Sequence, residues 1–372
     1  MKGAVTSHYT YLQYLHFKKE YQAHNKMNTK SLDFYEPLEI DGQKYIKMTK
    51  KEDQGVYEAG VTQEAFTAKD KYDYKGIVEN LERYGLCIVP SFIEPSKCDQ
   101  ILEELDPHFY RHDAWQGSPF PKETTVVTRA VLHSPTVLKE VVSDRLFCDM
   151  ANHFLNEKNY FLTGNVIRKC SSGIQLNSGI VYKVGAGAGD QGYHREDHIH
   201  HTIHQACDSF QYGKETLLGV GVAFTDMNKA NGATRVIIGS HLWGPHDSCG
   251  KFDKRMEFHV NAAKGDAVLF LGSLYHAASA NHTLEDRIAG YFFMSQGYLK
   301  QEENLHFGTD PEFFKDMPLE TLKLLGLTTS EPYCGHIDYK SPGHIANPSL
   351  FENEVEKGYY GETIKIIYDD KE

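Results

Sequence analysis

The stretch Tyr193-His194-Arg195-Glu196-Asp197 decides how the chain is interpreted, together with Leu274-Tyr275-His276, whose histidine follows His194 by 82 residues. In a β-strand, side chains at positions i and i+2 point to the same face, so His194 and Glu196 could bind one metal ion. His276 would reach that ion from a distant strand. Two histidines and one carboxylate leave the opposite coordination positions open, which is the ligand set of non-heme Fe(II) oxygenases.

Arg287 follows His276 by eleven residues. Its planar guanidinium could give a carboxylate two parallel hydrogen bonds, a geometry that a lysine cannot reproduce. The pattern therefore indicates metal chemistry that is assisted by a second molecule carrying a carboxylate.

Five histidines fall within eleven residues: His194, His198, His200, His201 and His204. A first alternative takes His198 and His200 as a cupin-like H-x-H pair with Glu215 downstream, which would need no 2-oxoglutarate. A second alternative takes His200 and His204, four residues apart, as a zinc pair on a helix. The set of His194, Glu196 and His276 is favoured. It alone is followed by an arginine, Arg287, at a spacing that suits the binding of a co-substrate.

The composition is that of a globular protein, with 40% hydrophobic and 24% charged residues in a chain of 372. The net charge of −12 argues against a nucleic-acid partner, because no cluster of Lys and Arg offsets it. No run of 18 apolar residues occurs, so we expect no transmembrane helix. The seven cysteines lack a C-x-x-C spacing, which favours free thiols in the cytoplasm over a disulfide framework.

The regular hydrophobic pattern begins at Lys75, where a helical stripe runs to Gly85. A buried strand is expected at 86–89, and Pro95 predicts the start of a second helix over 95–105. Ser134 and Pro135 predict the N-cap and first residue of a third helix that continues to Phe154. Residues 1–74 form an N-terminal extension in this interpretation, and residues 311–372 form a C-terminal segment that packs on the core.

Short β-rich runs follow from about Gly179, each bounded by Gly, Asn or Asp. The predicted strands are 180–184, 217–224, 234–238, 267–271 and 288–294. Several short strands with turn signals between them predict a sandwich or barrel. With helices in the first half, the expected fold is mainly β with flanking helices, and its core is a double-stranded β-helix (jelly roll) within residues 75–310.

Several motifs follow one another along the chain: Gln191–Asp197, Asn231–Arg235, Gly239–Trp243, the set of His276, Asn281 and Arg287, and Gln296–Asn304. In this order and spacing they resemble the phytanoyl-CoA dioxygenase-like family of Fe(II)/2-oxoglutarate oxygenases, especially its fungal members that modify secondary metabolites. The resemblance covers about residues 75–307, with the metal core at 185–301.

The resemblance implies an iron site of His194, a carboxylate and His276, with Arg287 binding the distal carboxylate of 2-oxoglutarate. It also implies that Gln191 and Thr234 assist this co-substrate. The expected cofactors are Fe(II), 2-oxoglutarate and O₂. The expected reaction is the oxidation of a small molecule by hydroxylation, desaturation, or oxidative cyclisation or rearrangement.

The carboxylate departs from the H-x-D pattern that is usual in the family, because Glu196 occupies the third position and Asp197 follows it. Glutamate is longer by one methylene and can still reach a metal. Asp197 would point to the opposite face of an extended strand, so its use would require a twist or bulge. Glu196 is therefore the expected ligand, and Asp197 is the alternative.

A small organic molecule is the expected substrate, because the sequence shows no basic patch for the phosphates of an acyl-CoA. The N-terminal extension could mediate a homodimer. A ligand-binding protein that keeps the jelly roll without the chemistry is the non-enzyme alternative, and it is motivated by the altered carboxylate and the long extension.

Overall fold

The computed structural model describes residues 61–111, 120–244, 252, 254–352 and 362–365, together with the strands β1 (Tyr35–Ile40) and β2 (Gln43–Met48). The chain divides into two compact units, residues 1–54 and residues 55–372. Within the first unit, β1 and β2 pair in antiparallel fashion. The rest of the predicted extension up to residue 60 lies outside the described residues, and the predicted boundaries at residues 74/75 and 310/311 stay predictions.

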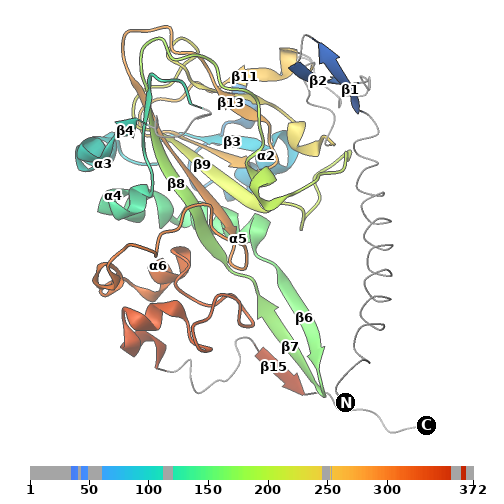
Figure 1. Ribbon diagram of the computed structural model, residues 1–372, viewed down its shortest axis with the longest axis vertical. Helices are drawn as coiled ribbons and strands as arrows, with labels where there is room; N and C mark the ends of the chain where they lie inside the picture. The colour runs from blue at the N-terminus through green and yellow to red at the C-terminus, as the bar shows by residue number, and fades with distance from the viewer. Residues whose placement is uncertain are drawn as a thin grey trace, which may run out of the picture. The chain divides into compact units, whose positions relative to one another are not determined.

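Two antiparallel sheets build the core of the second unit (Figure 1). The large sheet has seven strands in the order β3 (Leu86–Val89), β12 (Ala267–Leu271), β9 (Leu217–Ala223), β14 (Arg287–Gln296), β8 (Ile174–Val184), β5 (Thr124–Val127) and β4 (Tyr110–Arg111). The small sheet has three strands in the order β11 (Glu257–His259), β10 (Thr234–Ile237) and β13 (His276–Ala278). The five predicted strand runs correspond to β8, β9, β10, β12 and β14, and the jelly-roll core is confirmed.

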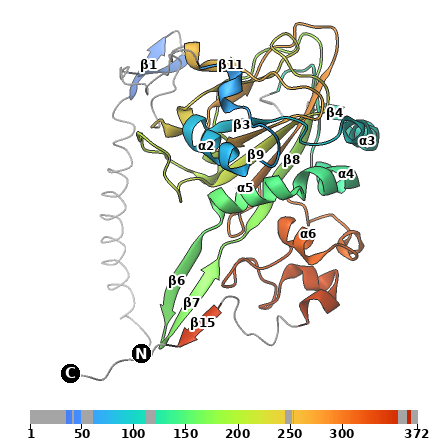
Figure 2. The ribbon, with the colours of Figure 1, turned by 180° about the vertical axis from the view of Figure 1, so that it is seen from behind.

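Helices cover one face of the large sheet, as Figure 2 shows for α2 (Tyr74–Tyr84), α3 (Pro95–Leu105) and α5 (Arg145–Leu155). Alternate residues of β9, Leu218, Val220 and Val222, belong to the same buried cluster as the apolar stripes of these helices. Because strand side chains alternate between faces, the other residues of β9 point toward the small sheet.

A second buried cluster lies against this inner face and includes Val236 and Ile237 of β10 and Phe270 and Phe293 of the large sheet. Glycine at position 219 makes room for these rings. A Cβ there would lie 2.6 Å from Phe293 and 2.8 Å from Phe270. The candidate site described below forms on this inner side, between the two sheets.

The prediction of one continuous third helix from Ser134 to Phe154 is wrong. Ser134 does cap the first segment by accepting a hydrogen bond from Val137, at 3.0 Å. However, α4 (Pro135–Val137) passes into a π-turn at Leu138–Val142, and α5 starts anew at residue 145. Asp144 causes the new start because its backbone is extended and its carboxylate accepts hydrogen bonds from the amides of residues 146 and 147.

A third sheet was not predicted: β6 (Lys158–Thr163), β7 (Val166–Ser171) and β15 (Glu362–Lys365) pair in antiparallel fashion and are separate from the core sheets (Figure 1). All of β6 is exposed. It therefore lacks the alternation of buried and exposed residues that makes a half-buried strand recognisable.

The remaining helices are short. They are α6 (Leu319–Leu324) and the 3-10 helices Gln63–Phe66, Asp106–His108, Ala130–Leu132, Glu196–His200, Ser240–Leu242, Lys254–Met256, Pro311–Phe314, Pro342–Ile345 and Pro348–Phe351. Phe314, Leu322 and Phe351 belong to the cluster beneath the helical face of the large sheet. The described part of the C-terminal segment thus contributes to that core.

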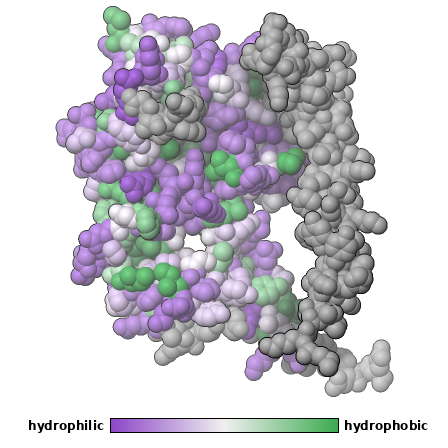
Figure 3. Space-filling view, in the orientation of Figure 1, coloured by the Kyte–Doolittle hydropathy of each residue, from purple (hydrophilic) through white to green (hydrophobic). Residues whose placement is uncertain are grey.

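The face in Figure 3 is mostly hydrophilic, with hydrophobic residues in small separate patches. Isolated apolar residues of this kind are normal on protein surfaces. In the described part of the chain, no helix combines the length and the apolar character that a bilayer span requires.

Replacing Gly219 by alanine should destabilise the fold, because the added Cβ would displace the rings of Phe293 and Phe270. Overpacking of this kind costs about 1–3 kcal/mol. The free energy of unfolding in urea measures the loss. Gly189→Ala is the control, since nothing lies within 4 Å of its Cβ position. Equal stabilities for both variants would show that the rings are free to move.

Candidate metal centre

A backbone bridge brings the two histidines together. The His194 amide donates to the carbonyl of His276 at 3.1 Å, and the His276 amide donates back at 3.0 Å. His276 begins β13, where it also pairs with Val236 of β10. The segment containing His194 therefore continues the small sheet beyond β13, and this pairing places two residues that are distant in sequence directly opposite each other.

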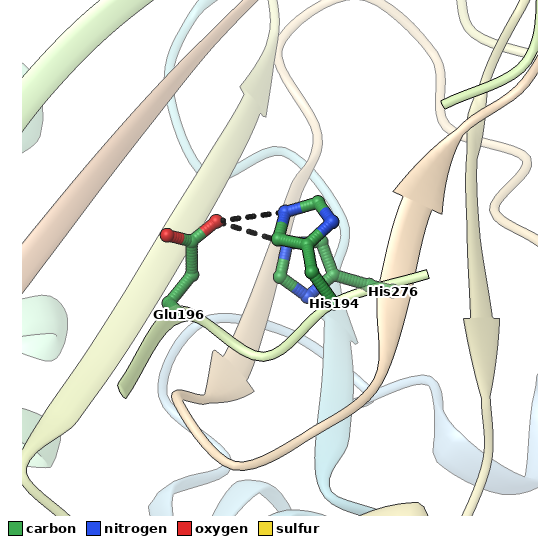
Figure 4. Close-up of side chains that lie close together, drawn as sticks. All are labelled: His194, Glu196 and His276. Atoms are coloured by element: carbon green, nitrogen blue, oxygen red, sulfur yellow. Dashed lines mark hydrogen bonds and ion pairs between the residues drawn. The ribbon is translucent and has the colours of Figure 1, made fainter. Parts of the chain in front are cut away.

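Glu196 points toward both imidazoles, as Figure 4 shows. Its Oε1 lies 3.3 Å from His194 Nε2 and 3.2 Å from His276 Nε2. The three ligand atoms lie within 4.8 Å of one another. Three donor atoms at such separations can share one metal ion on one side, leaving its opposite side open.

The backbone fixes the orientation of both imidazoles. His194 Nδ1 lies 3.0 Å from the carbonyl of Gly192, and His276 Nδ1 lies 3.1 Å from the carbonyl of Leu274. A carbonyl can only accept, so each Nδ1 carries the proton. When a ring is neutral, its Nε2 then keeps the lone pair that a metal needs, and this is the arrangement in which metal-binding histidines are usually held.

Glu196 is held as an anion. Burial alone would raise the pKa of its carboxyl, but the hydrogen bonds of His194 and His276, and the positive charge that these rings carry when protonated in the metal-free protein, outweigh burial and lower that pKa well below its usual range. For His194, burial acts to lower the imidazole pKa, and the interaction with Glu196 more than reverses this. The site thus provides one negative charge and two imidazoles in a partly buried position.

Asp197 lies apart from this group, although it follows directly in sequence. The chain is extended only to Arg195, and Glu196 starts a 3-10 helix, so the expectation of a continuous strand through residue 197 is wrong. The Asp197 side chain is 1% exposed and forms an ion pair with His204. The tight turn therefore aims Glu196 at the histidines and directs Asp197 into the interior.

Each histidine of the two alternative sites has at least one ring nitrogen in contact with another group, which for His198 is the carbonyl of Arg195. His200 Nδ1 lies 3.0 Å from the hydroxyl of Thr216, and His204 contacts Asp197. Glu215 accepts a hydrogen bond from Ser273 at 2.6 Å. Among the described residues, only one group of three or more His, Cys, Asp and Glu side chains is close enough to share a metal. The geometry therefore does not favour the cupin-like or the helical zinc arrangement.

A cavity that is partly open to solvent adjoins the three side chains. Its wall is formed by residues of both sheets and the loops between them: Phe120, Pro121, Thr124, Tyr182, Val184, Gly189, Gln191, His194, Glu196, Thr234, His276, Ala277, Ala278, Arg287, Tyr291 and Phe293. All six residues that the sequence singled out for the site therefore line the same cavity.

Arg287 presents unused donors in this cavity. It starts β14 opposite Val184, and its side chain is 1% exposed. One terminal nitrogen donates to the carbonyl of Gly232 at 2.7 Å. The Nε and the other terminal nitrogen are buried and have no hydrogen-bond partner among the described residues. A buried guanidinium with free donors is costly unless an anion accepts from it.

Gln191 and Thr234 are already engaged. The Gln191 side-chain oxygen accepts from the Ala278 amide at 3.1 Å, and the Thr234 hydroxyl is hydrogen bonded to that of Tyr291. Sequence reasoning missed Tyr291 and Tyr182 as cavity residues. The spacing held a signal for Tyr291, because it follows Arg287 by four residues on one strand and so shares its face. Burial raises the pKa of Tyr182 well above its usual value, so its hydroxyl stays protonated.

The family described as Phytanoyl-CoA dioxygenase (PhyH) matches residues 81–289. An uncharacterized protein of Saccharomyces cerevisiae, YJR154W, is 72% identical over 92% of this chain and 99% of its own length. Dioxygenase cnsJ of Penicillium expansum is 30% identical over 73% of this chain and 82% of its own. The solved epimerase SnoN in complex with Fe³⁺, alpha ketoglutarate and nogalamycin RO is 17% identical, with a TM-score of 0.47 over 65% of this chain and 94% of that one.

Replacing Asp197 by alanine should destabilise the metal-free protein strongly, because His204 would lose its buried partner. Breaking a buried pair costs about 3–5 kcal/mol. Asp99→Ala is the control, since the Asp99 side chain is 61% exposed and an ion pair at such a site, here with Lys264, is worth about 1 kcal/mol or less. Urea unfolding of both variants tests this, and equal losses would contradict a structural role for Asp197.

Proposed function

Because the chain belongs to the phytanoyl-CoA dioxygenase (PhyH) family, we propose that it is an Fe(II)/2-oxoglutarate-dependent dioxygenase that oxidises a small organic molecule. One observation carries this proposal. A two-histidine, one-carboxylate group and a buried arginine with free donors line the same cavity. The first suits a metal with open coordination positions, and the second suits a carboxylate.

His194, Glu196 and His276 are the proposed iron ligands. Two imidazoles and a carboxylate form a donor set that suits Fe(II), and each neutral imidazole offers the lone pair of its Nε2. The anionic form of Glu196, which the two histidines favour, is the form that binds a metal. Because the three ligands line the cavity, the remaining coordination positions of a bound metal would be open to a co-substrate and O₂.

Arg287 is the proposed binding site for the distal carboxylate of 2-oxoglutarate. The two buried nitrogens without partners can donate to a carboxylate, in the paired geometry that guanidinium groups favour. Leaving such donors unpaired costs about 1–3 kcal/mol each, so this site gains when a carboxylate occupies it. Gln191 and Thr234 line the same cavity and would limit the space around the co-substrate.

When bound, iron with 2-oxoglutarate and O₂ supplies the oxidising power to break a substrate C–H bond, while the co-substrate becomes succinate and CO₂. The chain itself orients these molecules and excludes water. Phe120, Val184 and Phe293 provide apolar wall, and the hydroxyls of Tyr182 and Tyr291 provide neutral donors.

The reaction belongs in this proposal to secondary-metabolite biosynthesis, as hydroxylation, desaturation, or oxidative cyclisation or rearrangement. The cytoplasm is the proposed location. The six cysteines in the described part of the chain are free thiols, which is typical of a reducing compartment. A homodimer also remains a prediction, and the oligomeric state in solution will test it.

Removing the proposed carboxylate ligand should abolish iron binding. Glu196→Ala is expected to weaken Fe(II) binding by more than about 100-fold, since even changes behind the ligands cost about 10–100-fold. Iron retained after anaerobic gel filtration measures this. Asp197→Ala, measured at a temperature where it is folded, is the matched control and should retain most of its iron. The reverse pattern would assign the carboxylate role to Asp197.

Removing Arg287 should affect the co-substrate and spare the metal. In wild-type protein, anaerobic addition of Fe(II) and 2-oxoglutarate should give the weak visible charge-transfer band of a chelated complex. Arg287→Ala should still bind Fe(II) but require on the order of 100-fold more 2-oxoglutarate, the consequence of losing a buried charged hydrogen-bond partner.

Arg287→Lys is the control, because it keeps the charge and loses the paired donor geometry; its affinity for 2-oxoglutarate should be intermediate. Normal binding of 2-oxoglutarate by Arg287→Ala would remove the arginine from the proposal. Full substrate oxidation without 2-oxoglutarate would favour a cupin-like oxygenase. Absence of succinate formation with iron bound would favour a ligand-binding protein.

A further inference from the structure

A buried polar cluster lies behind the proposed metal ligands and has no part in the chemistry described so far. It contains Glu215, Asp197 and His204, which are 3%, 1% and 7% exposed. Glu215 lies two residues before β9, and its carboxylate has no lysine or arginine partner among the described ion pairs. A carboxylate buried so completely needs hydrogen bonds, and these lead to the metal site.

The cluster meets the site at Gly272. The carbonyl of Gly272 accepts the amide protons of both Glu196, at 3.0 Å, and Asp197, at 3.3 Å. The Gly272 amide in turn donates to the carbonyl of Leu217 at 2.8 Å. A Cβ at position 272 would lie 2.6 Å from that of Leu217 and 3.3 Å from that of Asp197. Only glycine allows this close approach. The first two amides of the turn that carries Glu196 therefore share one acceptor, the carbonyl of Gly272.

Glu215 holds the next residue. One carboxylate oxygen accepts from the Ser273 hydroxyl at 2.6 Å, and the other accepts from the Ser273 amide at 3.3 Å. Ser273 is fully buried and lies three residues before His276. Leu274, the residue after Ser273, supplies the carbonyl that orients the His276 ring. Residues 273 and 274 therefore contact both the Glu215 carboxylate and the ring of His276.

We propose that Glu215 is a positioning residue for the metal, which acts by clamping Ser273 and thereby fixing the Gly272 carbonyl and the start of β13. The inference rests on the proposed function. Two bonds from one carboxylate to one residue restrict both its backbone and its side chain. A shift of this corner would move Glu196 and His276 together, because both are attached to it.

The geometry also explains why the corner needs a dedicated clamp. Gly272 has no side chain with which to anchor itself, and its backbone must support the 3-10 turn at Glu196–His200. Groups behind metal ligands that fix their orientation typically contribute about 10–100-fold to metal affinity. The cupin-like alternative treated Glu215 as a metal ligand. In this proposal Glu215 does not touch the metal and acts through the backbone that carries the ligands.

The test compares Glu215→Gln with Glu303→Gln by anaerobic Co(II) titration of the full chain, followed by absorption. Glu303 is a matched control, because it is 8% exposed and likewise accepts two hydrogen bonds, from the amides of Arg129 and Gly179. Burial raises the pKa of both Glu215 and Glu303 to about 7. Each substitution therefore removes one hydrogen-bond acceptor from a carboxyl group of similar burial and similar pKa.

Glu215→Gln should weaken Co(II) binding by about 10–100-fold, whereas Glu303→Gln should stay within about threefold of wild type. The affinity for 2-oxoglutarate at saturating Co(II) should be unchanged in both, because Arg287 is not part of the clamp. Unchanged Co(II) affinity in Glu215→Gln, or equal losses in both variants, would overturn the proposal.

Ser273→Ala provides a second route if Glu215→Gln does not fold, since it removes only the hydroxyl donor. It should weaken Co(II) binding in the same direction, and the double variant should lose no more than Glu215→Gln alone, because the two residues act as one unit. Full affinity in Ser273→Ala, or additive losses, would overturn the clamp. If wild-type protein itself fails to bind Co(II), the proposed function falls, whereas failure of the clamp alone leaves wild-type binding intact.

Discussion

The pair of backbone hydrogen bonds between His194 and His276 is the contact on which the rest of the site depends. It joins a loop after β8 to the first residue of β13 and sets which residues face one another. A slip of one residue would turn either imidazole to the opposite face. The contact is reinforced from behind by Gly272, whose carbonyl receives the amide of Glu196. The ligand geometry is therefore mainly a consequence of strand register and of one glycine.

The cavity has two places that would attract a negatively charged group: a metal bound by the three ligands, and the guanidinium of Arg287. At one end, two imidazoles and a carboxylate can bind a cation whose open side faces the cavity. At the other, the buried Arg287 guanidinium keeps donors without partners. A dianion with carboxylates at both ends suits both places, and 2-oxoglutarate is such a molecule. Arg287 starts β14 of the large sheet and His276 starts β13 of the small one, so the two sheets bring the arginine and the metal ligands to the same cavity.

The sequence was sufficient to predict what depends on local pattern. Pro95, Gly85 and the apolar runs predicted the helices and strands of the core. The spacing of the histidines, the carboxylate and the arginine singled out four residues that line the cavity, and the family resemblance added Gln191 and Thr234. It was insufficient where two local signals compete. Ser134 caps the start of one helix and Asp144 caps the start of the next. The sequence does not show whether the first helix continues past Asp144 or stops before it. Likewise, the turn at Glu196 depends on a carbonyl from Gly272, which is 76 residues away.

The most direct test of the account is a crystal structure of the protein grown without oxygen in the presence of Fe(II) and 2-oxoglutarate, with the metal located by anomalous diffraction. The account predicts one iron bound by His194 Nε2, the Glu196 carboxylate and His276 Nε2, and 2-oxoglutarate that chelates it while its far carboxylate pairs with Arg287. Iron bound by Asp197, or by His198, His200 and Glu215, or 2-oxoglutarate seated away from Arg287, would contradict it.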